Sequence, residues 1–130
     1  MTPTTYAPVH GTPELVLACD RGRRWRLLIV PALFDEGNRM RRFTVELMRR
    51  FDKAGIDSFL PDLPGTNDSI APLSQQSPED WKAAVAAAAE YFGATHVLGI
   101  RGGAVLVPHD RPSWLYAPVN GAAMLRQLMR

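Results

Sequence analysis

Residues 96–103 carry the clearest indication of chemistry in this sequence. An apolar run over 96–100 is followed by Arg101, and Gly102 and Gly103 come directly after it. Such a run stopped by glycines predicts a strand that ends in a sharp turn, which presents one side chain at the edge of a sheet. Arg101 is that side chain. Its guanidinium stays protonated, so it cannot act as a nucleophile, but it can bind a carboxylate through two parallel contacts.

Two acids, Asp35 and Glu36, follow another apolar run at 27–30. If both runs are parallel strands of one sheet, their carboxyl ends meet at the edge where open α/β sheets bind ligands. We therefore expect Arg101 to pair with Asp35 or Glu36, or to bind a small anionic ligand. Both roles are compatible, since Glu36 can orient Arg101 toward a ligand. The Gly102 and Gly103 backbone would belong to the same site.

A second candidate chemistry is hydrolysis by a serine. Ser69 and Ser113 are the candidate nucleophiles, and His109 is the candidate base that would accept the serine proton. This set describes an atypical esterase or thioesterase. His109 stands beside Asp110 in a predicted loop, where a surface turn explains both residues without catalysis.

Composition excludes several classes of protein. The 130 residues, 46% of them hydrophobic, predict one globular domain over 1–130. A net charge of +2, without a basic stripe and stacking aromatics, argues against nucleic-acid binding. The single cysteine, Cys19, excludes an internal disulfide and a cysteine-rich metal site. We also expect no metal and no cofactor. Without a membrane-length apolar run or a signal peptide, we expect no membrane insertion and a cytoplasmic location.

The first elements are predicted from turn residues and hydrophobic spacing. Residues 1–12 contain prolines and predict an extended N-terminal arm. Strands at 14–19 and 25–31, separated by turn formers, predict an antiparallel hairpin at the sheet edge. Residues 38–54 predict a helix, because apolar residues recur there at helical spacing, and Gly55 suits its C-terminal end.

The middle of the chain alternates strands and helices. A strand at 56–61 leads into a loop, and Ser77 and Pro78 begin a helix that ends near Gly93. A strand over 95–100 follows. This alternation predicts a mostly parallel sheet between helices, which is a three-layer α/β/α sandwich with an antiparallel strand at the N-terminal edge.

The last third is less regular. Residues 104–111 predict an extended return segment, with an antiparallel strand as the alternative. A final strand at 112–117 and an amphipathic helix at 121–130 follow. Trp114, Tyr116 and this helix would expose apolar surface, which predicts a homodimer through the C-terminal strand and helix.

Two of these segments resemble motifs of α/β-hydrolases. Residues 62–69, DLPGTNDS, resemble the D-x-P-G-x-G-x-S loop of that family. Residues 99–103, GIRGG, resemble its nucleophile elbow, G-x-S-x-G, with Arg101 in the place of the serine. The order of the motifs resembles the N-terminal half of an α/β-hydrolase, over 25–130. The resemblance implies a truncated α/β-hydrolase-like fold in which the loop after residues 28–30 supplies backbone N–H donors.

A closer resemblance rests on residues 31–42, PALFDEGNRMRR. They resemble the acidic-pair, Asn and Arg-Arg motif of hydrolase-like proteins associated with exosortase A systems, whose second type also has arginine in the elbow. Residues 115–121 are similar to their segment around the sixth strand. The resemblance implies an exopolysaccharide and protein-sorting context in a Gram-negative bacterium.

A Ser-His-Asp/Glu triad needs the order serine, acid, histidine. Arg101 replaces the serine, and neither His10 nor His96 is placed to act as a base. We therefore predict a non-catalytic protein, a pseudoenzyme that serves as a binding or assembly partner. The esterase or thioesterase remains the alternative.

Overall fold

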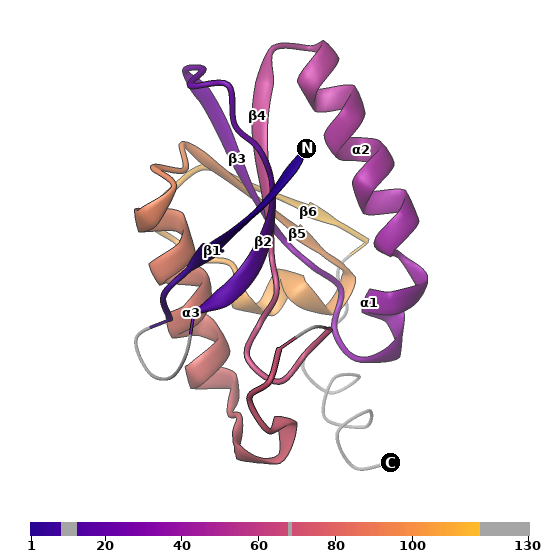
Figure 1. Ribbon diagram of the computed structural model, residues 1–130, viewed down its shortest axis with the longest axis vertical. Helices are drawn as coiled ribbons and strands as arrows, with labels where there is room; N and C mark the ends of the chain where they lie inside the picture. Colours follow the sequence, from indigo (N-terminus) through magenta and orange to yellow (C-terminus); the bar gives the residue numbers. More distant parts are fainter. Residues whose placement is uncertain (9–12, 68, 118–130) are drawn as a thin grey trace.

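A six-stranded sheet with the order β1-β2-β4-β3-β5-β6 forms the middle of the molecule in the computed structural model (Figure 1). The structure describes residues 1–8, 13–67 and 69–117. The strands are β1 (Thr2–Tyr6), β2 (Glu14–Cys19), β3 (Trp25–Val30), β4 (Ile56–Pro61), β5 (His96–Ile100) and β6 (Ser113–Tyr116). The helices are α1 (Asp35–Arg39), α2 (Arg41–Lys53) and α3 (Pro78–Tyr91), with short 3-10 helices η1 (Leu73–Gln75) and η2 (Arg101–Leu106).

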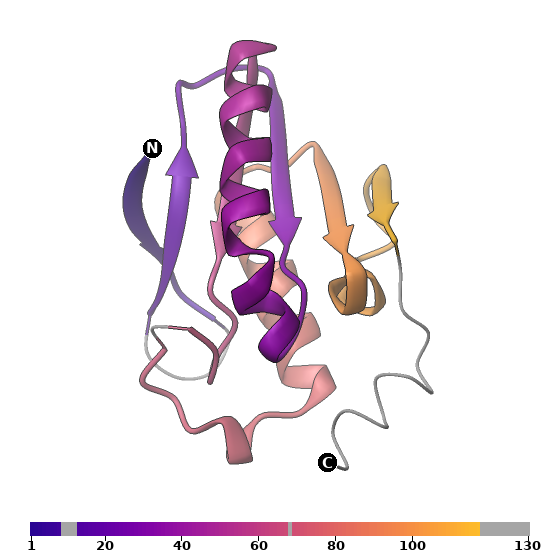
Figure 2. The same cartoon turned by 90° about the vertical axis from the view of Figure 1, so that its right-hand side faces the viewer.

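The sheet is parallel over four strands and antiparallel at one edge. Strands β4, β3, β5 and β6 run parallel, whereas β2 is antiparallel to both β1 and β4. Helix α2 covers one face and α3 the other (Figure 2). The predicted three-layer α/β/α architecture, with antiparallel pairing at the N-terminal edge, is confirmed. Among the described residues, no helix is long and apolar enough to span a membrane.

Local signals placed the boundaries of α3 correctly. The Ser77 side chain accepts from the Asp80 N–H, and the Asp80 carboxylate accepts from the Ser77 N–H at 2.9 Å. This reciprocal capping box satisfies two backbone donors at the start of the helix. After the helix, Gly93 has φ +60°, and Gly55 after α2 has φ +84°, a conformation that costs glycine little.

The predicted hairpin of 14–19 with 25–31 is wrong. Strand β2 lies between β1 and β4, while β3 lies between β4 and β5. The physical reason is burial, because the run Leu27, Leu28, Ile29, Val30 is 0–3% exposed and needs neighbours on both sides and both faces. Residues 2–6 of the expected arm are extended, yet they form an edge strand, and the Tyr6 hydroxyl donates to the Asp62 carbonyl at 2.7 Å.

Two other segments differ from expectation. The helix predicted at 38–54 is divided into α1 and α2 at Met40, and α2 buries Thr44 and Met48 while Phe43 lies at its exposed margin. The return segment expected over 104–111 is not wholly extended, because η2 continues to Leu106. The last strand is parallel to β5, as expected. The helix predicted at 121–130 lies outside the described residues.

The core has two halves, one on each face of the sheet. Small alanines let α3 approach the sheet closely on one side, where Ala84 and Ala88 are almost completely buried beside Phe59 and Trp81. Met48 of α2 packs on Ile29 and Ile100 on the other side. Both halves of the core hold the carboxyl ends of β3, β4 and β5 together. These strand ends form the lower edge of the sheet in Figure 2, which is distinct from the edge strands β1 and β6.

Candidate functional site

Arg101 stands directly after β5, in a strained turn. Its φ is +52°, a region that non-glycine residues rarely occupy. The glycines on either side are needed for the turn to pack. A Cβ on Gly99 would lie 2.8 Å from the Ala104 Cα, and one on Gly103 would lie 2.7 Å from the Val30 carbonyl oxygen. The glycine spacing of the elbow motif is therefore a steric requirement, whatever residue stands at its centre.

The guanidinium of Arg101 links three elements. Its Nε lies 3.1 Å from Glu36 Oε1 on α1, and its Nη1 donates to the Ala117 carbonyl at 2.9 Å, just after β6. The ion pair expected for Arg101 is thus present, to Glu36 rather than to Asp35, which is exposed at the start of α1. Since the Arg101 side chain keeps 36% of its surface exposed, it remains accessible to a ligand.

Backbone strain gathers at the same edge of the sheet. Within the described residues, four that are not glycine have positive φ: Phe34, Asn67, Arg101 and Ala117. Each follows the carboxyl end of a different parallel strand, β3, β4, β5 or β6. Such conformations cost on the order of 1–3 kcal/mol each and concentrate at functional sites. This concentration marks the Arg101 edge as the candidate site.

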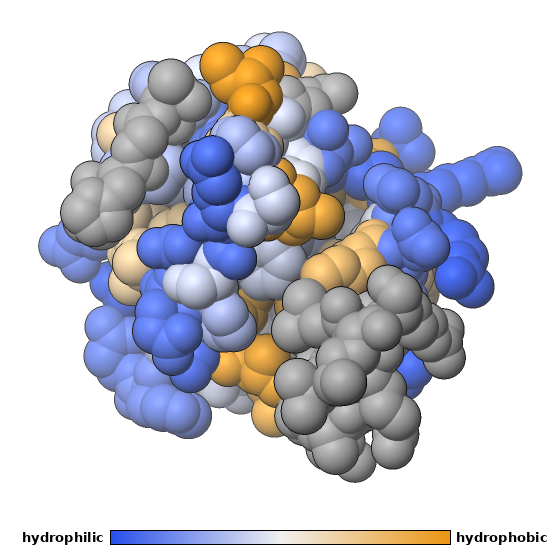
Figure 3. Space-filling model, turned by 90° about the horizontal axis from the view of Figure 1, so that it is seen from below, coloured by the Kyte–Doolittle hydropathy of each residue, from blue (hydrophilic) through white to orange (hydrophobic). Residues whose placement is uncertain are grey.

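A hollow of about 210 Å³ lies beside this edge, between the loops that follow β3 and β4. Polar side chains line part of it, including Asn38, Arg41 and Asp62. The Asp62 carboxylate is buried, accepts from the Asn67 amide at 3.0 Å and lies 3.7 Å from Arg41 Nη1. Figure 3 shows this end of the molecule, where hydrophilic side chains surround a few hydrophobic ones.

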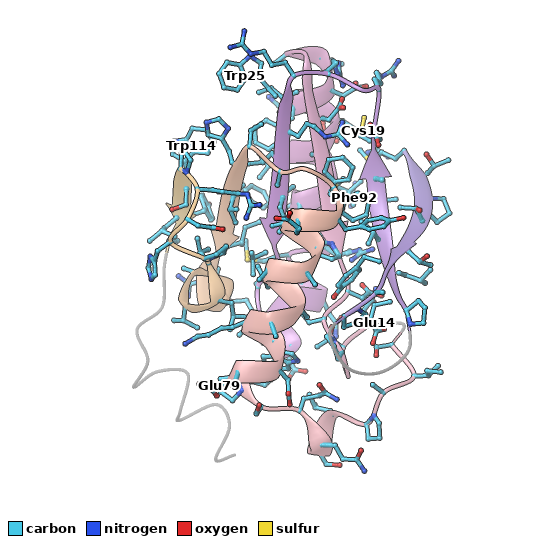
Figure 4. All side chains as sticks on the ribbon, turned by 90° about the vertical axis from the view of Figure 1, so that its left-hand side faces the viewer. Glu14, Cys19, Trp25, Glu79, Phe92 and Trp114 are labelled. Atoms are coloured by element: carbon cyan, nitrogen blue, oxygen red, sulfur yellow. The ribbon has the colours of Figure 1, made fainter. Side chains whose placement is uncertain are left out.

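The candidate nucleophile Ser69 belongs to a buried polar cluster. Its hydroxyl lies 2.8 Å from Glu14 Oε2 and accepts from the N–H of Gly65 at 2.9 Å. Glu14, labelled in Figure 4, is only 3% exposed, and burial raises its pKa above the ordinary value. Burial, with Glu14 nearby, also raises the pKa of Tyr6. Among the residues that the structure describes, these contacts join Ser69 to the loop backbone and to the Glu14 carboxylate.

The other residues of the alternative chemistry lie on the surface. Ser113 is exposed at the start of β6, and His109 is exposed in the segment before it. His96, at the opposite end of β5 from Arg101, contacts Thr95 Oγ1 through Nδ1 at 2.9 Å. The roles of Ser69, Ser113 and His109 in catalysis stay predictions. In the described part of the chain, no group of three metal-binding side chains comes together.

Sequence reasoning missed three of the four strained residues. Asn67 carries a weak signal, because asparagine tolerates positive φ better than most residues. Phe34 and Ala117 carry none, since their conformations follow from how the loops meet the sheet. Asp68 of the same loop and His10 of the arm lie outside the described residues.

Comparisons with solved structures show the α/β-hydrolase fold. The chain is similar to a CIB-like hydrolase from Thermoplasma acidophilum, with a TM-score of 0.71, 15% identity, and coverage of 95% of this chain and 65% of that one. It is also similar to mouse alpha/beta hydrolase domain-containing protein 10, with a TM-score of 0.67, 14% identity, and coverage of 82% and 42%. A third similar structure is epoxide hydrolase A from Mycobacterium thermoresistibile, with a TM-score of 0.57, 20% identity, and coverage of 81% of this chain and 33% of that one.

The chain thus spans between one third and two thirds of the length of these three hydrolases. No model of a protein family matches it, and a comparison with curated protein sequences finds no match either. At these identities the likeness establishes the fold, which agrees with the fold implied by the elbow and the loop at 62–69.

Proposed function

We propose that this protein is a non-catalytic member of the α/β-hydrolase fold that acts as a binding or assembly partner. The observation that carries the proposal is Arg101 at the apex of the elbow, where the motif G-x-S-x-G has its nucleophile. A guanidinium that is permanently protonated offers no electron pair for attack on a carbonyl carbon. The turn is retained, together with its strained backbone, while the group it presents is suited to binding.

The ligand we propose for this edge is a small anion with a carboxylate. Glu36 and the Ala117 carbonyl hold Arg101 through Nε and Nη1. A guanidinium carries five N–H donors, so these two contacts leave donors for a ligand oxygen. Glu36 is then a positioning residue, and the Gly102 and Gly103 backbone forms the floor beneath the ligand.

The assembly role is supported by the resemblance of residues 31–42 to proteins of exosortase A systems. On this resemblance we propose an exopolysaccharide and protein-sorting context. The cytoplasmic location and the homodimer are proposed on other grounds, which are the sequence pattern of the N-terminus and the apolar C-terminal segment. Strand β6 supplies the exposed apolar side chains that such a dimer would cover. The terminal segment, 121–130, is proposed to contribute on the basis of its sequence alone.

Thermal unfolding in the presence of succinate tests the binding site. Succinate should raise the melting temperature of the wild-type chain more than sodium chloride does at equal ionic strength. Arg101→Asn should abolish this difference, because asparagine keeps positive φ accessible but removes the cation. Arg42→Asn, which changes an exposed arginine of α2, serves as the matched control and should respond like wild type. An equal response in Arg101→Asn would refute the site.

The alternative, an esterase or thioesterase that uses Ser69 or Ser113 with His109, is tested by covalent labelling. A fluorophosphonate probe and p-nitrophenyl acetate are offered to the full chain. The non-catalytic proposal requires that neither labelling nor turnover exceeds that of the heat-denatured protein. Labelling lost specifically in Ser69→Ala or Ser113→Ala would establish the enzyme and overturn the proposal.

A further inference from the structure

The two edges of the sheet differ in how they are protected. Edge strand β1 is polar and contains Pro3, which lacks an N–H. Edge strand β6, the yellow strand at the right of Figure 2, has no charged residue, and all four of its residues are exposed. Trp114, Leu115 and Tyr116 keep 57%, 52% and 46% of their surface exposed. Within residues 1–8, 13–67 and 69–117, no strand pairs with the outer side of β6, and an apolar edge of this kind is a site for pairing with another strand.

The register of β5 with β6 shows which backbone groups are free to pair. The Val97 N–H donates to the Pro112 carbonyl at 3.0 Å, and Val97 stands opposite Ser113. In a parallel ladder, alternate residues face the neighbouring strand. Trp114 therefore turns its peptide groups toward β5, while Ser113 and Leu115 turn theirs toward the open edge.

We infer that β6 pairs with β6 of a second copy of this chain, antiparallel and centred on Trp114. The inference rests on the assembly role proposed above and specifies its interface. In this register Ser113 of each copy stands opposite Leu115 of the other copy. Each of these two residue pairs exchanges two N–H···O bonds, so four such bonds form between the two β6 strands. A shift by two residues would leave two of them. The result is an isologous dimer with one continuous sheet.

Aromatic side chains support the same arrangement. The rings of Trp25, His96 and Trp114 form a row on the α2 face, with centroids 5.3 and 5.1 Å apart. Figure 4 shows Trp25 and Trp114 at the same end of the sheet. Pairing centred on Trp114 would place it opposite Trp114 of the second copy, with Cα atoms about 4.5 Å apart. Two rows of three rings would then become one row of six.

The area available indicates a dimer of modest affinity. An aromatic side chain buries about 150–250 Å² when fully covered, so the three half-exposed side chains of β6 offer roughly 300 Å². A standard interface buries about 800 Å² per partner. The area beyond the roughly 300 Å² from these three side chains must therefore come from backbone and flanking residues. Nearby charges do not oppose pairing, because Arg111 pairs with Asp110 at 3.1 Å and with Glu90 at 3.2 Å. We expect dimerisation to depend on concentration.

Cysteine cross-linking of the full chain tests the register. Trp114→Cys should give a covalent dimer on mild oxidation, because Cα atoms about 4.5 Å apart lie within the range for a disulfide. Ser113→Cys is the matched control and should not cross-link, since residue 113 faces residue 115 of the second copy. The wild-type chain should not either, because its one cysteine, Cys19, is buried. Cross-linking of Ser113→Cys in preference to Trp114→Cys would overturn the register.

Light scattering separates failure of this interface from failure of the assembly role. Leu115→Pro removes an outward N–H and should give a monomer, whereas Leu115→Ala keeps that N–H and should retain more of the dimer. Circular dichroism verifies that both variants fold. A wild-type dimer that survives Leu115→Pro, without a Trp114→Cys cross-link, would overturn the interface and leave the assembly role standing. A wild-type monomer at all concentrations would overturn both.

Discussion

Replacing Asp57 by alanine should destabilise the protein strongly. Asp57 lies in β4 with its side chain fully buried. Its carboxylate accepts from the Arg23 N–H at 2.9 Å, from Arg23 Nε at 2.7 Å and from Arg26 Nη1 at 2.8 Å. Removing one partner of a buried ion pair costs about 3–5 kcal/mol. The cost expected here lies near the lower end of that range, because Arg23 keeps Asp52 and Arg26 keeps Asp20 as partners. That cost is a large part of the roughly 5–15 kcal/mol that stabilises a domain.

The same arginine provides the control. Asp20 also pairs with Arg26 Nη1, at 2.9 Å, but 46% of its side chain is exposed. An exposed pair contributes about 0–1 kcal/mol, so Asp20→Ala should cost at least about 2 kcal/mol less than Asp57→Ala. Urea unfolding at pH 7 measures both differences from the shift in midpoint. Asp57→Asn, which keeps one acceptor oxygen, should fall between them. Equal costs for the two alanine variants would refute the idea that burial determines the strength of this network.

Three further predictions follow from the structure. Burial raises the pKa of Glu14 above its ordinary value of 4.5, so its ionised form opposes folding. The stability of Glu14→Gln relative to wild type should therefore increase as the pH rises above 4.5, because glutamine does not ionise. Urea midpoints at pH 4 and pH 8 measure this, and a constant difference would contradict it. Gly103→Ala should cost about 1–3 kcal/mol, since its Cβ would meet the Val30 carbonyl at 2.7 Å; a neutral effect on the melting temperature would show that the elbow adjusts. Ser77→Ala should cost about 1 kcal/mol in the same measurement by removing the helix cap, and loss of less than about 0.3 kcal/mol would argue against it.

Much of the fold was predictable from local patterns. The capping box at Ser77, the left-handed glycines after both long helices and the strand before Arg101 each involve groups close together in the chain. Their physics is local, so the sequence contains it. The alternation of these elements then led to a parallel sheet between two helical layers.

Strand pairing was less predictable, because it is decided by residues far apart in the chain. A turn between 19 and 25 suggested a hairpin, yet β2 pairs with β1 and β4. The buried Asp57 illustrates the same limit, since its partners come from residues more than 30 positions earlier in the chain. Only the register of β3 with β4 brings these charges together in the interior.

For the candidate site, the sequence by itself determined its composition: an elbow flanked by glycines, an arginine in place of a nucleophile and an acidic pair after another strand. The tertiary structure decided which acid pairs with Arg101, because only the position of α1 relative to β5 selects Glu36. It also placed the strained residues after four strands at one edge, since each conformation depends on where its loop meets the sheet. Residue types are written in the sequence, whereas their distances follow from packing.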